Sequence, residues 1–494
     1  MTFRGHELTI AGLGASRSRP LGALRAQRLI DLAGLRLAPA VTGGLIAYSH
    51  YRQVGPALLV FATMLAAAQM IERSRFPLQL MPAARVALAL FAPAFGALVA
   101  LAIMALLGLP SHSGELVPAV IGAWLVVGLG GWTKARLEDS ARARVAVIGS
   151  PRFAADLREE LRFAGVRAYE VIGWLGSEGP DRRGDDGIGW LGSLEQLRGA
   201  ILVNRVDLLV CSADREAPPG AAPGGGTWEL AAAACLDLPV RMIGANQFYE
   251  DLLGHVPIGT IDQAWCRYVL HPNFQSMAPL SKRVLDLVLA TSIGIVTLPL
   301  LAIGALAVKL YDGGPVLYRQ RRLGEHGEQF EIMKLRSMGT DAEADGQARW
   351  SEKEDDRITP VGRVLRRTHI DELPQLWNVL RGDMTVIGPR PERPEMVAEL
   401  ERQYSHYTRR QLLRPGIAGW AQVRCGYAGS DLGTAWKLCH DLYYIKHRSA
   451  LADLLITLET AFVAFRDAHR ALRTPQERFI LEERARELGE GASG

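Results

Sequence analysis

The sequence predicts a mixed fold, in which a membrane α-helical bundle is joined to two α/β domains. Three observations predict it: four apolar stretches near the N-terminus, strands that alternate with helices in the middle of the chain, and a fifth apolar stretch, interrupted by a proline, ahead of a second α/β segment. The 494 residues are 49% hydrophobic, and their mean hydropathy is +0.07. Both values suit a mixture of membrane helices and water-exposed domains.

The N-terminal apolar stretches cover residues 29–48, 54–71, 86–108 and 116–133. Each approaches the roughly 20 residues that a helix needs to cross a bilayer. Basic residues cluster before the first stretch, between the second and third, and after the fourth, so the positive-inside rule places both ends of the bundle in the cytoplasm. We expect four transmembrane helices over 29–136, after a cytoplasmic tail at 1–28. A soluble bundle is the weaker alternative, because apolar residues run all round each helix.

Residues 143–270 alternate between short apolar strands, at 145–148, 206–211 and 238–243, and helical segments. This alternation is typical of a parallel, Rossmann-like sheet. Gly149-Ser-Pro-Arg-Phe stands where the glycines of a dinucleotide-binding loop would be expected. The domain is therefore predicted to be a degenerate nucleotide-binding fold, and a structural or regulatory role is favoured over cofactor binding.

The fifth apolar stretch, residues 281–309, is long enough to cross a bilayer as a straight helix. Pro299 lies inside it and removes one hydrogen bond from the helical ladder. After four spans, a fifth would carry the arginine-rich residues that follow to the outside, against the positive-inside rule. A helix that enters one leaflet, bends near Pro299 and returns keeps them in the cytoplasm. We favour this re-entrant helix over a plain span.

Residues 310–473 predict a compact α/β domain. Extended segments on either side of Gly324 and Gly327 are typical of a β-hairpin. Short helices are expected at 361–367 and 373–380, the second with Pro374 in its first turn. Residues 474–494 form a charged C-terminal tail whose role the sequence does not indicate.

Asp371 and Glu372 are adjacent acids that follow Arg366 and Arg367. Adjacent acids are common at solvated helix starts, where they complement the helix dipole. The nearby arginines and Pro374 favour a chemical role instead. One carboxylate can attack phosphorus, its neighbour can hold a divalent ion, and arginines can neutralise phosphate oxygens. The pair therefore suits transfer of a phosphorylated group at a membrane surface.

Two further blocks carry polar side chains that suit a phosphorylated substrate. In Gly388-Pro-Arg-Pro, two prolines hold the backbone of Arg390 extended and orient its guanidinium. An ordinary turn with a solvated arginine explains this tetrapeptide equally well. In the block from Arg414 to Val423, Gln422 can hydrogen-bond, and Trp420 can pack against a base, a sugar or the membrane interface. Burial of Trp420 in the core is an equally good interpretation.

Neither disulfides nor a metal centre of cysteine and histidine is expected. The five cysteines are odd in number and form no CxxC pair, which is typical of reduced core thiols. The histidines lack a ligand spacing such as HExxH. The net charge of +4 offers no argument for nucleic acid binding, and we expect no nucleic acid partner.

Residues 281–466 resemble the catalytic region of bacterial sugar transferases, the polyprenyl-phosphate hexose-1-phosphate transferases that start exopolysaccharide or O-antigen repeat units. The ordered blocks that carry the resemblance are Lys282-Arg-Val-Leu-Asp-Leu, Gly314-Pro-Val-Leu-Tyr-Arg-Gln, Lys334-Leu-Arg-Ser-Met, the run from Asp371 to Met384, Gly388-Pro-Arg-Pro, the run from Arg414 to Val423, and Asp441-Leu-Tyr-Tyr-Ile-Lys. Pro-Glu-Arg-Pro-Glu at 391–395 resembles the exopolysaccharide biosynthesis subgroup. The four spans and the Rossmann-like domain resemble the large, multi-domain branch.

The resemblance implies a monotopic phosphoglycosyl transferase that moves hexose-1-phosphate from a UDP-sugar to undecaprenyl phosphate through a covalent aspartyl-phosphosugar intermediate. Asp371 matches the family's nucleophile, and Glu372 matches the residue that holds Mg²⁺. Arg390 matches the phosphate-contacting arginine, and Pro299 matches the helix-breaking proline.

The other expected site residues are basic or polar. Lys334 and Arg336 match a basic strand near the site, and we also expect Arg367, Arg414 and Gln422 to bind phosphate or substrate. Arg424-Cys425 replaces the usual Asn-Gly after Gln-Val, beside the expected substrate pocket, so the sequence does not name the hexose.

The expected partners are a UDP-hexose, undecaprenyl phosphate and membrane lipid, with Mg²⁺ as cofactor; whether the chain forms a homodimer stays open. The expected location is the bacterial inner (cytoplasmic) membrane, with the catalytic domain in the cytoplasm. One alternative is a non-catalytic membrane scaffold for polysaccharide assembly, which has no physical need for the acid pair. Another is a nucleotide-sugar dehydratase at 144–270, which would need a cofactor glycine loop and a Tyr-x-x-x-Lys pair that this region lacks.

Overall fold

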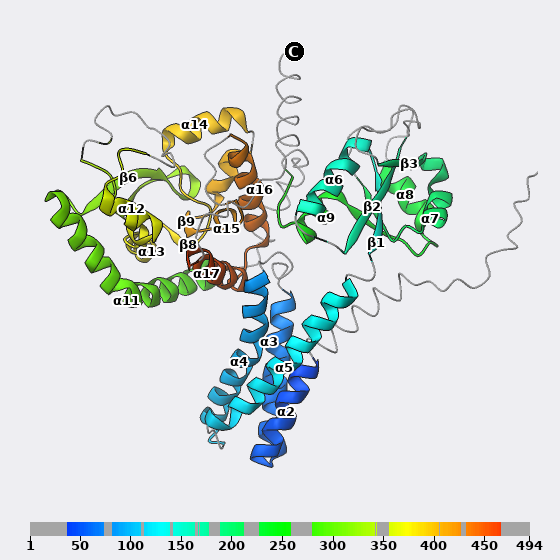
Figure 1. The fold of residues 1–494 in the computed structure, drawn as a ribbon, viewed down its shortest axis with the longest axis horizontal. Coiled ribbons are helices and arrows are strands. Elements are labelled where there is room, and N and C mark those ends of the chain that lie inside the picture. The colour runs from blue at the N-terminus through cyan, green and yellow to red at the C-terminus, as the bar shows by residue number, and fades with distance from the viewer. Residues whose placement is uncertain are drawn as a thin grey trace, which may run out of the picture. The chain divides into compact units, whose positions relative to one another are not determined.

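The computed structural model describes residues 37–73, 82–109, 113–138, 142–163, 166, 168–176, 188–211, 227–257, 279–340, 342, 355–404, 406–425 and 431–465. The expected tails at 1–28 and 474–494 lie outside these residues, as do residues 258–270 of the expected Rossmann-like domain. The chain divides into two compact units, one of residues 1–69 and 89–245 and the other of 70–88 and 246–494. Figure 1 identifies the elements of both units.

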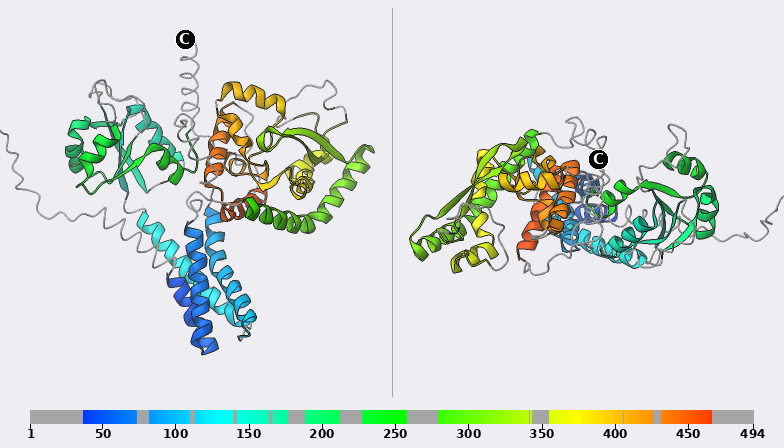
Figure 2. Two further views of the ribbon diagram at one scale, coloured as in Figure 1. Left: turned by 180° about the vertical axis from the view of Figure 1, so that it is seen from behind. Right: turned by 90° about the horizontal axis from the view of Figure 1, so that it is seen from above.

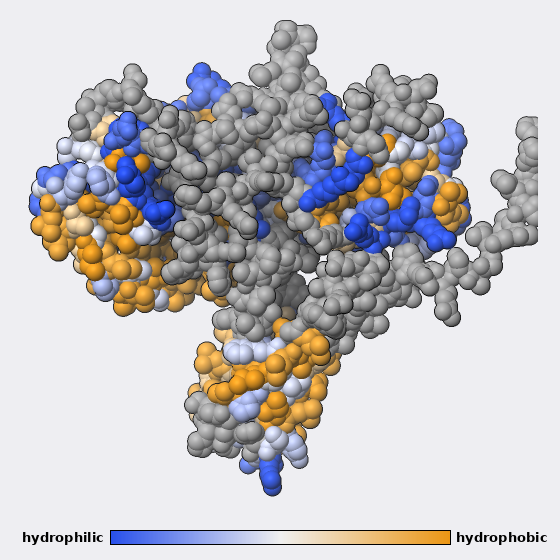
Figure 3. Space-filling view, viewed as in Figure 1, coloured by the Kyte–Doolittle hydropathy of each residue, from blue (hydrophilic) through white to orange (hydrophobic). Residues whose placement is uncertain are grey.

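Four apolar helices follow one another near the N-terminus: α2 (Ala38–Tyr51), α3 (Val54–Arg73), α4 (Pro82–Leu106) and α5 (Ser113–Glu138). Small residues allow close approach, since a Cβ on Gly43 of α2 would lie only 2.4 Å from Met64 Sδ of α3. Leucines such as Leu45 and Leu98 nevertheless remain exposed, and Figure 3 shows an apolar outer surface on these helices. The helices are therefore apolar outside as well as inside.

Within the described residues, one helix is both long enough and apolar enough to be a candidate membrane span, and it is α11 at Leu280–Asp312. The N-terminal helices contain shorter apolar segments at Val54–Gln69, Ala92–Leu106 and Leu116–Val127. Residues 29–36 of the first expected span are not among those described. The four N-terminal helices are present, but their crossing of a membrane stays a prediction.

The middle domain contains the parallel sheet that the sequence predicts. Its strands are β1 (Ala143–Ile148), β2 (Tyr169–Leu175), β3 (Gly189–Gly192), β4 (Leu208–Cys211) and β5 (Arg241–Gly244). They lie in the order β3-β2-β1-β4-β5, which is a Rossmann arrangement. Helix α6 (Pro151–Phe163) follows β1, whereas α7 (Leu197–Asn204) and α8 (Thr227–Cys235) bury one face of the sheet.

The helix that follows β5 packs with the C-terminal domain. Helix α9 (Ala245–Leu252) carries Glu250, which binds Lys446 Nζ at 2.6 Å and His447 Nε2 at 2.7 Å. Just beyond α9, the carbonyl oxygen of Gly254 accepts a hydrogen bond from Trp420 Nε1 at 2.8 Å. The sequence assigns these residues to the Rossmann-like domain, but residues 246–257 belong to the compact unit of the C-terminal domain.

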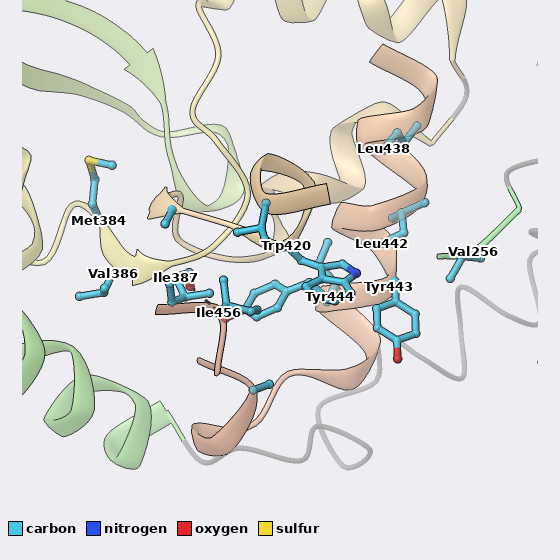
Figure 4. Close-up of a cluster of buried hydrophobic side chains, with 14 of the residues drawn as sticks. Val256, Met384, Val386, Ile387, Trp420, Leu438, Leu442, Tyr443, Tyr444 and Ile456 are labelled. Carbon is cyan, nitrogen blue, oxygen red and sulfur yellow. Dashed lines mark hydrogen bonds between the residues drawn. The ribbon is translucent and has the colours of Figure 1, made fainter. Parts of the chain in front are cut away.

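The C-terminal domain combines the expected β-hairpin with small helices. The hairpin is β6 (Leu317–Leu323) and β7 (Gln329–Leu335), and a second, parallel pair is β8 (Thr385–Ile387) and β9 (Gly416–Ala418). The helices are α12 (Pro360–Arg367), α13 (Gln375–Arg381), α14 (Pro394–Gln403), α15 (Trp420–Cys425), α16 (Asp431–His447) and α17 (Ala450–Phe465). Figure 4 shows the core where β8, α15, α16 and α17 bury their apolar side chains.

Helix α11 (Pro279–Asp312) is a single bent helix that contains Pro299. Figures 1 and 2 show its curved course, with the concave side toward α12 and α13, which it contacts. Pro299 is exposed, as are Val296 and Leu298 beside it at 76% and 61%. Beyond the bend, a Cβ on Gly304 would lie 3.0–3.1 Å from side chains of β7, α12 and Ile370. Both ends of α11 are thus packed on the domain, whereas its apolar middle is uncovered (Figure 3).

His255 makes the contact between the α9 segment and α16 sensitive to pH. The side chain is buried, and its ring lies 4.5 Å from the ring of Trp436 and 5.5 Å from that of His440. Burial lowers the pKa of His255 from 6.5 to about 4. Because the unfolded chain takes up this proton first as the pH falls, stability declines between these two values.

Replacing His255 with phenylalanine should keep the aromatic packing and remove this proton uptake. We expect the loss of unfolding free energy between pH 7 and pH 5 to be smaller than in the wild type by roughly 2 kcal/mol. Thermal unfolding of the full chain in detergent, followed by tryptophan fluorescence, measures it. His326→Asn, at an exposed histidine, is the control. An equal decline in His255→Phe and wild type would contradict the expectation.

Candidate active site

The two acids lie in a short 3₁₀ turn, Ile370–Glu372, between α12 and α13. His369 precedes the turn in the left-handed region at φ 56°, which reverses the chain after α12. Asp371 is only 6% exposed. Solvated helix-start acids would be open to water, so burial of Asp371 argues against the dipole-only interpretation of this pair.

Glu372 is fixed by two cations from different segments. Lys334 Nζ of β7 and Arg390 Nη2 each lie 2.8 Å from Glu372 Oε1. Burial alone would raise the pKa of Glu372, but Arg390 and Lys334 together hold it well below its usual range. Glu372 is therefore a permanent anion at neutral pH, and the sequence correctly groups Lys334 and Arg390 with it.

Asp371 has the opposite electrostatic character. Burial raises its pKa, and the neighbouring charge of Glu372 raises it further, while Lys334 and Arg366 oppose the shift. A carboxylate with a raised pKa is a stronger base and nucleophile than a solvated one. Two adjacent acids thus receive different environments, which is how proteins divide roles between paired carboxylates.

Asn378 sets the position of the acid turn relative to β7. The side chain of this fully buried residue of α13 accepts from Met333 N at 3.0 Å and donates to Glu331 O at 2.8 Å. It therefore completes the hydrogen bonding of the inner edge of β7 beside Lys334. Gly382, at φ +102°, then ends α13.

Arg390 lies on a loop that packs tightly against β9. A Cβ on Gly416 would lie 2.1 Å from Gly388 N, and one on Gly419 would lie 2.3 Å from Gly388 O. Glycine is therefore required at residues 416 and 419, where this segment meets the backbone of Gly388. The contact joins the Gly388-Pro-Arg-Pro block to the block that begins at Arg414.

Four expected substrate residues have other surroundings. Arg336 binds both carboxylate oxygens of Asp312 and donates to Pro315 O, which fixes the chain after α11. Arg414 pairs with Glu325 at 3.0 Å, and Gln422 donates to Ile417 O at 3.2 Å. Arg367 is exposed in the last turn of α12, and its neighbour Arg366 is the arginine that acts on Asp371. Their substrate roles stay predictions.

Trp420 is fully buried and donates to Gly254 O, so the core interpretation of this residue is correct. It does not present its face to a base or sugar. Arg424 lies over its ring at 4.1 Å.

A polar network at the start of α11 was not recognised from the sequence. Lys282 Nζ binds Asp453 Oδ2 at 2.6 Å and the carbonyl of Ile387 at 3.1 Å. Asp286 accepts from Thr385 Oγ1 at 2.7 Å and from Val386 N at 3.1 Å. The available signal was a lysine and an aspartate four residues apart at the start of an apolar helix, which predicts one polar face that must be paired. This network fixes the first half of α11 to β8.

Residues 277–467 match the family described as bacterial sugar transferase. A UDP-glucose:undecaprenyl-phosphate glucose-1-phosphate transferase of Caulobacter vibrioides is 43% identical over 183 residues, which cover 37% of this chain and 68% of that relative. The chain belongs to the bacterial sugar transferase family. The acid turn, Lys334 and Arg390 all lie in the matched residues.

Other members of the family differ in length and in named sugar. A UDP-N-acetylgalactosamine-undecaprenyl-phosphate N-acetylgalactosaminephosphotransferase of Aeromonas hydrophila is 38% identical over 235 residues, 48% of this chain and 55% of the relative. The chain thus matches about half the length of that curated relative. An exopolysaccharide production protein of Rhizobium leguminosarum bv. phaseoli is 39% identical over 185 residues, 36% of this chain and 92% of the relative.

Gly416→Ala should destabilise the C-terminal domain, because the added methyl group would overlap the backbone of Gly388. We expect a loss of about 3 kcal/mol of unfolding free energy, measured as a lower thermal midpoint in detergent. Gly294→Ala is the matched control in α11, since its Cβ would meet only Leu376 Cδ1 at 3.9 Å. Equal midpoints for the two variants would show that the β9 contact is loose.

Proposed function

We propose that this sugar transferase moves a hexose-1-phosphate from a UDP-sugar to undecaprenyl phosphate. The observation that carries the proposal is the division of the acid pair: buried Asp371 with a raised pKa lies next to Glu372, an anion held by Lys334 and Arg390. A nucleophile and a fixed charge cluster within one turn suit attack on a diphosphate. The names of the relatives support the donor and acceptor classes.

In the proposed first step, a carboxylate oxygen of Asp371 attacks the β-phosphorus of the UDP-sugar. The bond from that phosphorus to the bridging oxygen breaks, and UMP leaves with the electron pair. An aspartyl-phosphosugar remains on the enzyme. In the second step, an oxygen of undecaprenyl phosphate attacks the same phosphorus, the bond to Asp371 breaks, and the free carboxylate is restored. Lys334 and Arg390 would offset the negative charge that both steps concentrate at the site.

Glu372 fits the expected Mg²⁺ only together with the substrate. Within the part of the chain that the structure describes, no group of three or more histidine, cysteine, aspartate or glutamate side chains could hold a metal ion. Mg²⁺ is commonly bound by one or two carboxylates plus substrate phosphates, and an ionised Glu372 supplies one such ligand. Bound there, Mg²⁺ would neutralise the diphosphate and assist departure of UMP.

The membrane arrangement is also part of the proposal. The bent α11, with packed ends and an uncovered apolar middle, supports a re-entrant helix that enters one leaflet and returns. With four N-terminal spans, the acid turn would lie on the cytoplasmic side of the bacterial inner membrane, where UDP-sugars are available. A lipid-linked phosphate could then approach the acid turn along the same helix. A purely scaffolding role gives no reason to bury Asp371, with its raised pKa, beside this anion.

Asp371→Asn should abolish transfer, because an amide oxygen does not form the covalent intermediate. We expect UMP release from a panel of UDP-hexoses to fall by a factor on the order of 10³ or more. Without acceptor, wild-type protein should retain the labelled sugar phosphate and the variant should not. Asp356→Asn, at an exposed aspartate, is the matched control. Near wild-type transfer by Asp371→Asn would exclude the nucleophile, and a wild type that releases UMP from no sugar nucleotide would exclude the function.

Glu372→Gln should weaken the dependence on Mg²⁺ more than a distant substitution does. We expect the Mg²⁺ concentration for half-maximal UMP release to rise by about tenfold or more. Titration of the rate with MgCl₂ after removal of metal by a chelator measures it. Glu331→Gln on β7, where the side chain is 56% exposed, is the control. An unchanged Mg²⁺ requirement in Glu372→Gln would remove this residue from the metal site.

A further inference from the structure

Arg410 is a buried arginine that directly contacts the backbone of Arg390. It lies in a 3₁₀ segment, Tyr407–Leu412, and is 7% exposed. Its Nε donates to Asp441 Oδ2 at 2.7 Å, Nη1 to the Tyr407 hydroxyl at 2.5 Å, and Nη2 to the carbonyl oxygen of Arg390 at 3.2 Å. Burial disfavours its charge, but Tyr407, Asp441 and Glu392 raise the pKa of Arg410, so the guanidinium stays charged.

In the loop around Arg390, the four consecutive carbonyl groups of residues 389–392 each accept a hydrogen bond. Two backbone amides donate to the loop: Gly416 N to Pro389 O at 2.9 Å, and Leu323 N to Glu392 O at 3.0 Å. Two arginine side chains donate to it as well: Arg410 to Arg390 O, and Arg322 to Pro391 O at 3.2 Å. These four hydrogen bonds are the clamp contacts. Prolines at 389 and 391 have no N–H, so the carbonyls carry the polar anchoring of this loop. The clamp contacts therefore hold the backbone on both sides of Arg390, whose side chain binds Glu372.

A small cavity leaves room for the loop to shift if the clamp is weakened. The cavity of about 20 Å³ is lined by residues that include Pro389, Arg390, Arg410 and Tyr407. Loss of the Arg410 side chain would enlarge it and free the Arg390 carbonyl on that side. Even a displacement of about 1 Å at a charged contact can lower a rate by about 100-fold.

We propose that Arg410, oriented by Asp441, is a positioning residue that fixes the Arg390 loop and thereby the contact of Arg390 with Glu372. The expected change in kcat rests on the proposed transfer reaction, whereas the expected displacement of the Arg390 loop does not. Lysine cannot replace Arg410, because a single ammonium cannot bind Asp441, Tyr407 and the Arg390 carbonyl in the same planar fork.

Two kinetic variants and one matched control test it in the full chain. Arg410→Ala and Arg410→Lys should lower kcat for UMP release about 10- to 100-fold, and added guanidinium ion should restore part of the activity of Arg410→Ala. Arg409→Ala, at the exposed neighbouring arginine, should keep the wild-type rate and not respond to guanidinium. A kcat of Arg410→Ala within twofold of Arg409→Ala would overturn the proposal.

Hydrogen exchange tests whether Arg410 fixes the loop independently of whether the protein catalyses the proposed reaction. In Arg410→Ala, the amides of Gly416 and Leu323, which donate to the carbonyls of Pro389 and Glu392, should exchange faster, while the amides in the rest of the β6–β7 hairpin keep their wild-type rates. Unchanged exchange of these two amides, or equally faster exchange across the domain, would overturn the positioning role. If the wild type releases UMP from no sugar nucleotide, the proposed function fails, and the exchange measurement still decides whether Arg410 fixes the loop.

Discussion

The contact of one carboxylate oxygen with two cations organises the candidate site. Glu372 Oε1 brings together β7 through Lys334, the acid turn through its own backbone, and the proline-rich loop through Arg390. A buried anion that lost either cation would carry a large desolvation cost, so the three segments are held to one arrangement. That arrangement leaves Asp371 buried beside a negative charge, with its pKa raised. The different characters of the two acids therefore follow from a single electrostatic constraint.

The first half of α11 is held by a similar polar constraint at its N-terminal end. Lys282 joins Asp453 of α17 to the carbonyl of Ile387 in β8, and Arg283 donates to the carbonyls of Val379 and Leu380 at the end of α13. These polar contacts thus fix the position of an otherwise apolar helix on the domain and its rotation about its own axis. In the proposed membrane arrangement, the exposed apolar middle could contact lipid without moving the acid turn, because these polar contacts lie at the start of the helix.

The sequence predicts those parts of the fold that depend on patterns of neighbouring residues. The parallel sheet, the hairpin and the helices around the acids follow from alternating apolar residues, glycine turns and Pro374. Lys334 and Arg390 could be grouped with the acids because a known family carries them in the same blocks. Arg336 and Arg414 show the limit, since a basic residue near a site in sequence can be paired with Asp312 or Glu325 in space. Arg410 and Asp441, 31 residues apart, form a pair that no local pattern indicates.

The α9 segment belongs to the C-terminal domain although it lies outside the residues that match the family. The Rhizobium relative is matched over 92% of its length by 36% of this chain, so that relative is much shorter than this chain. In this chain, however, the carbonyl of Gly254 and the carboxylate of Glu250 belong to the interior of the C-terminal domain. The C-terminal stretch of that compact unit therefore begins at residue 246, ahead of the matched family residues 277–467, and a chain cut at the start of that match would lose two hydrogen-bond acceptors from its interior.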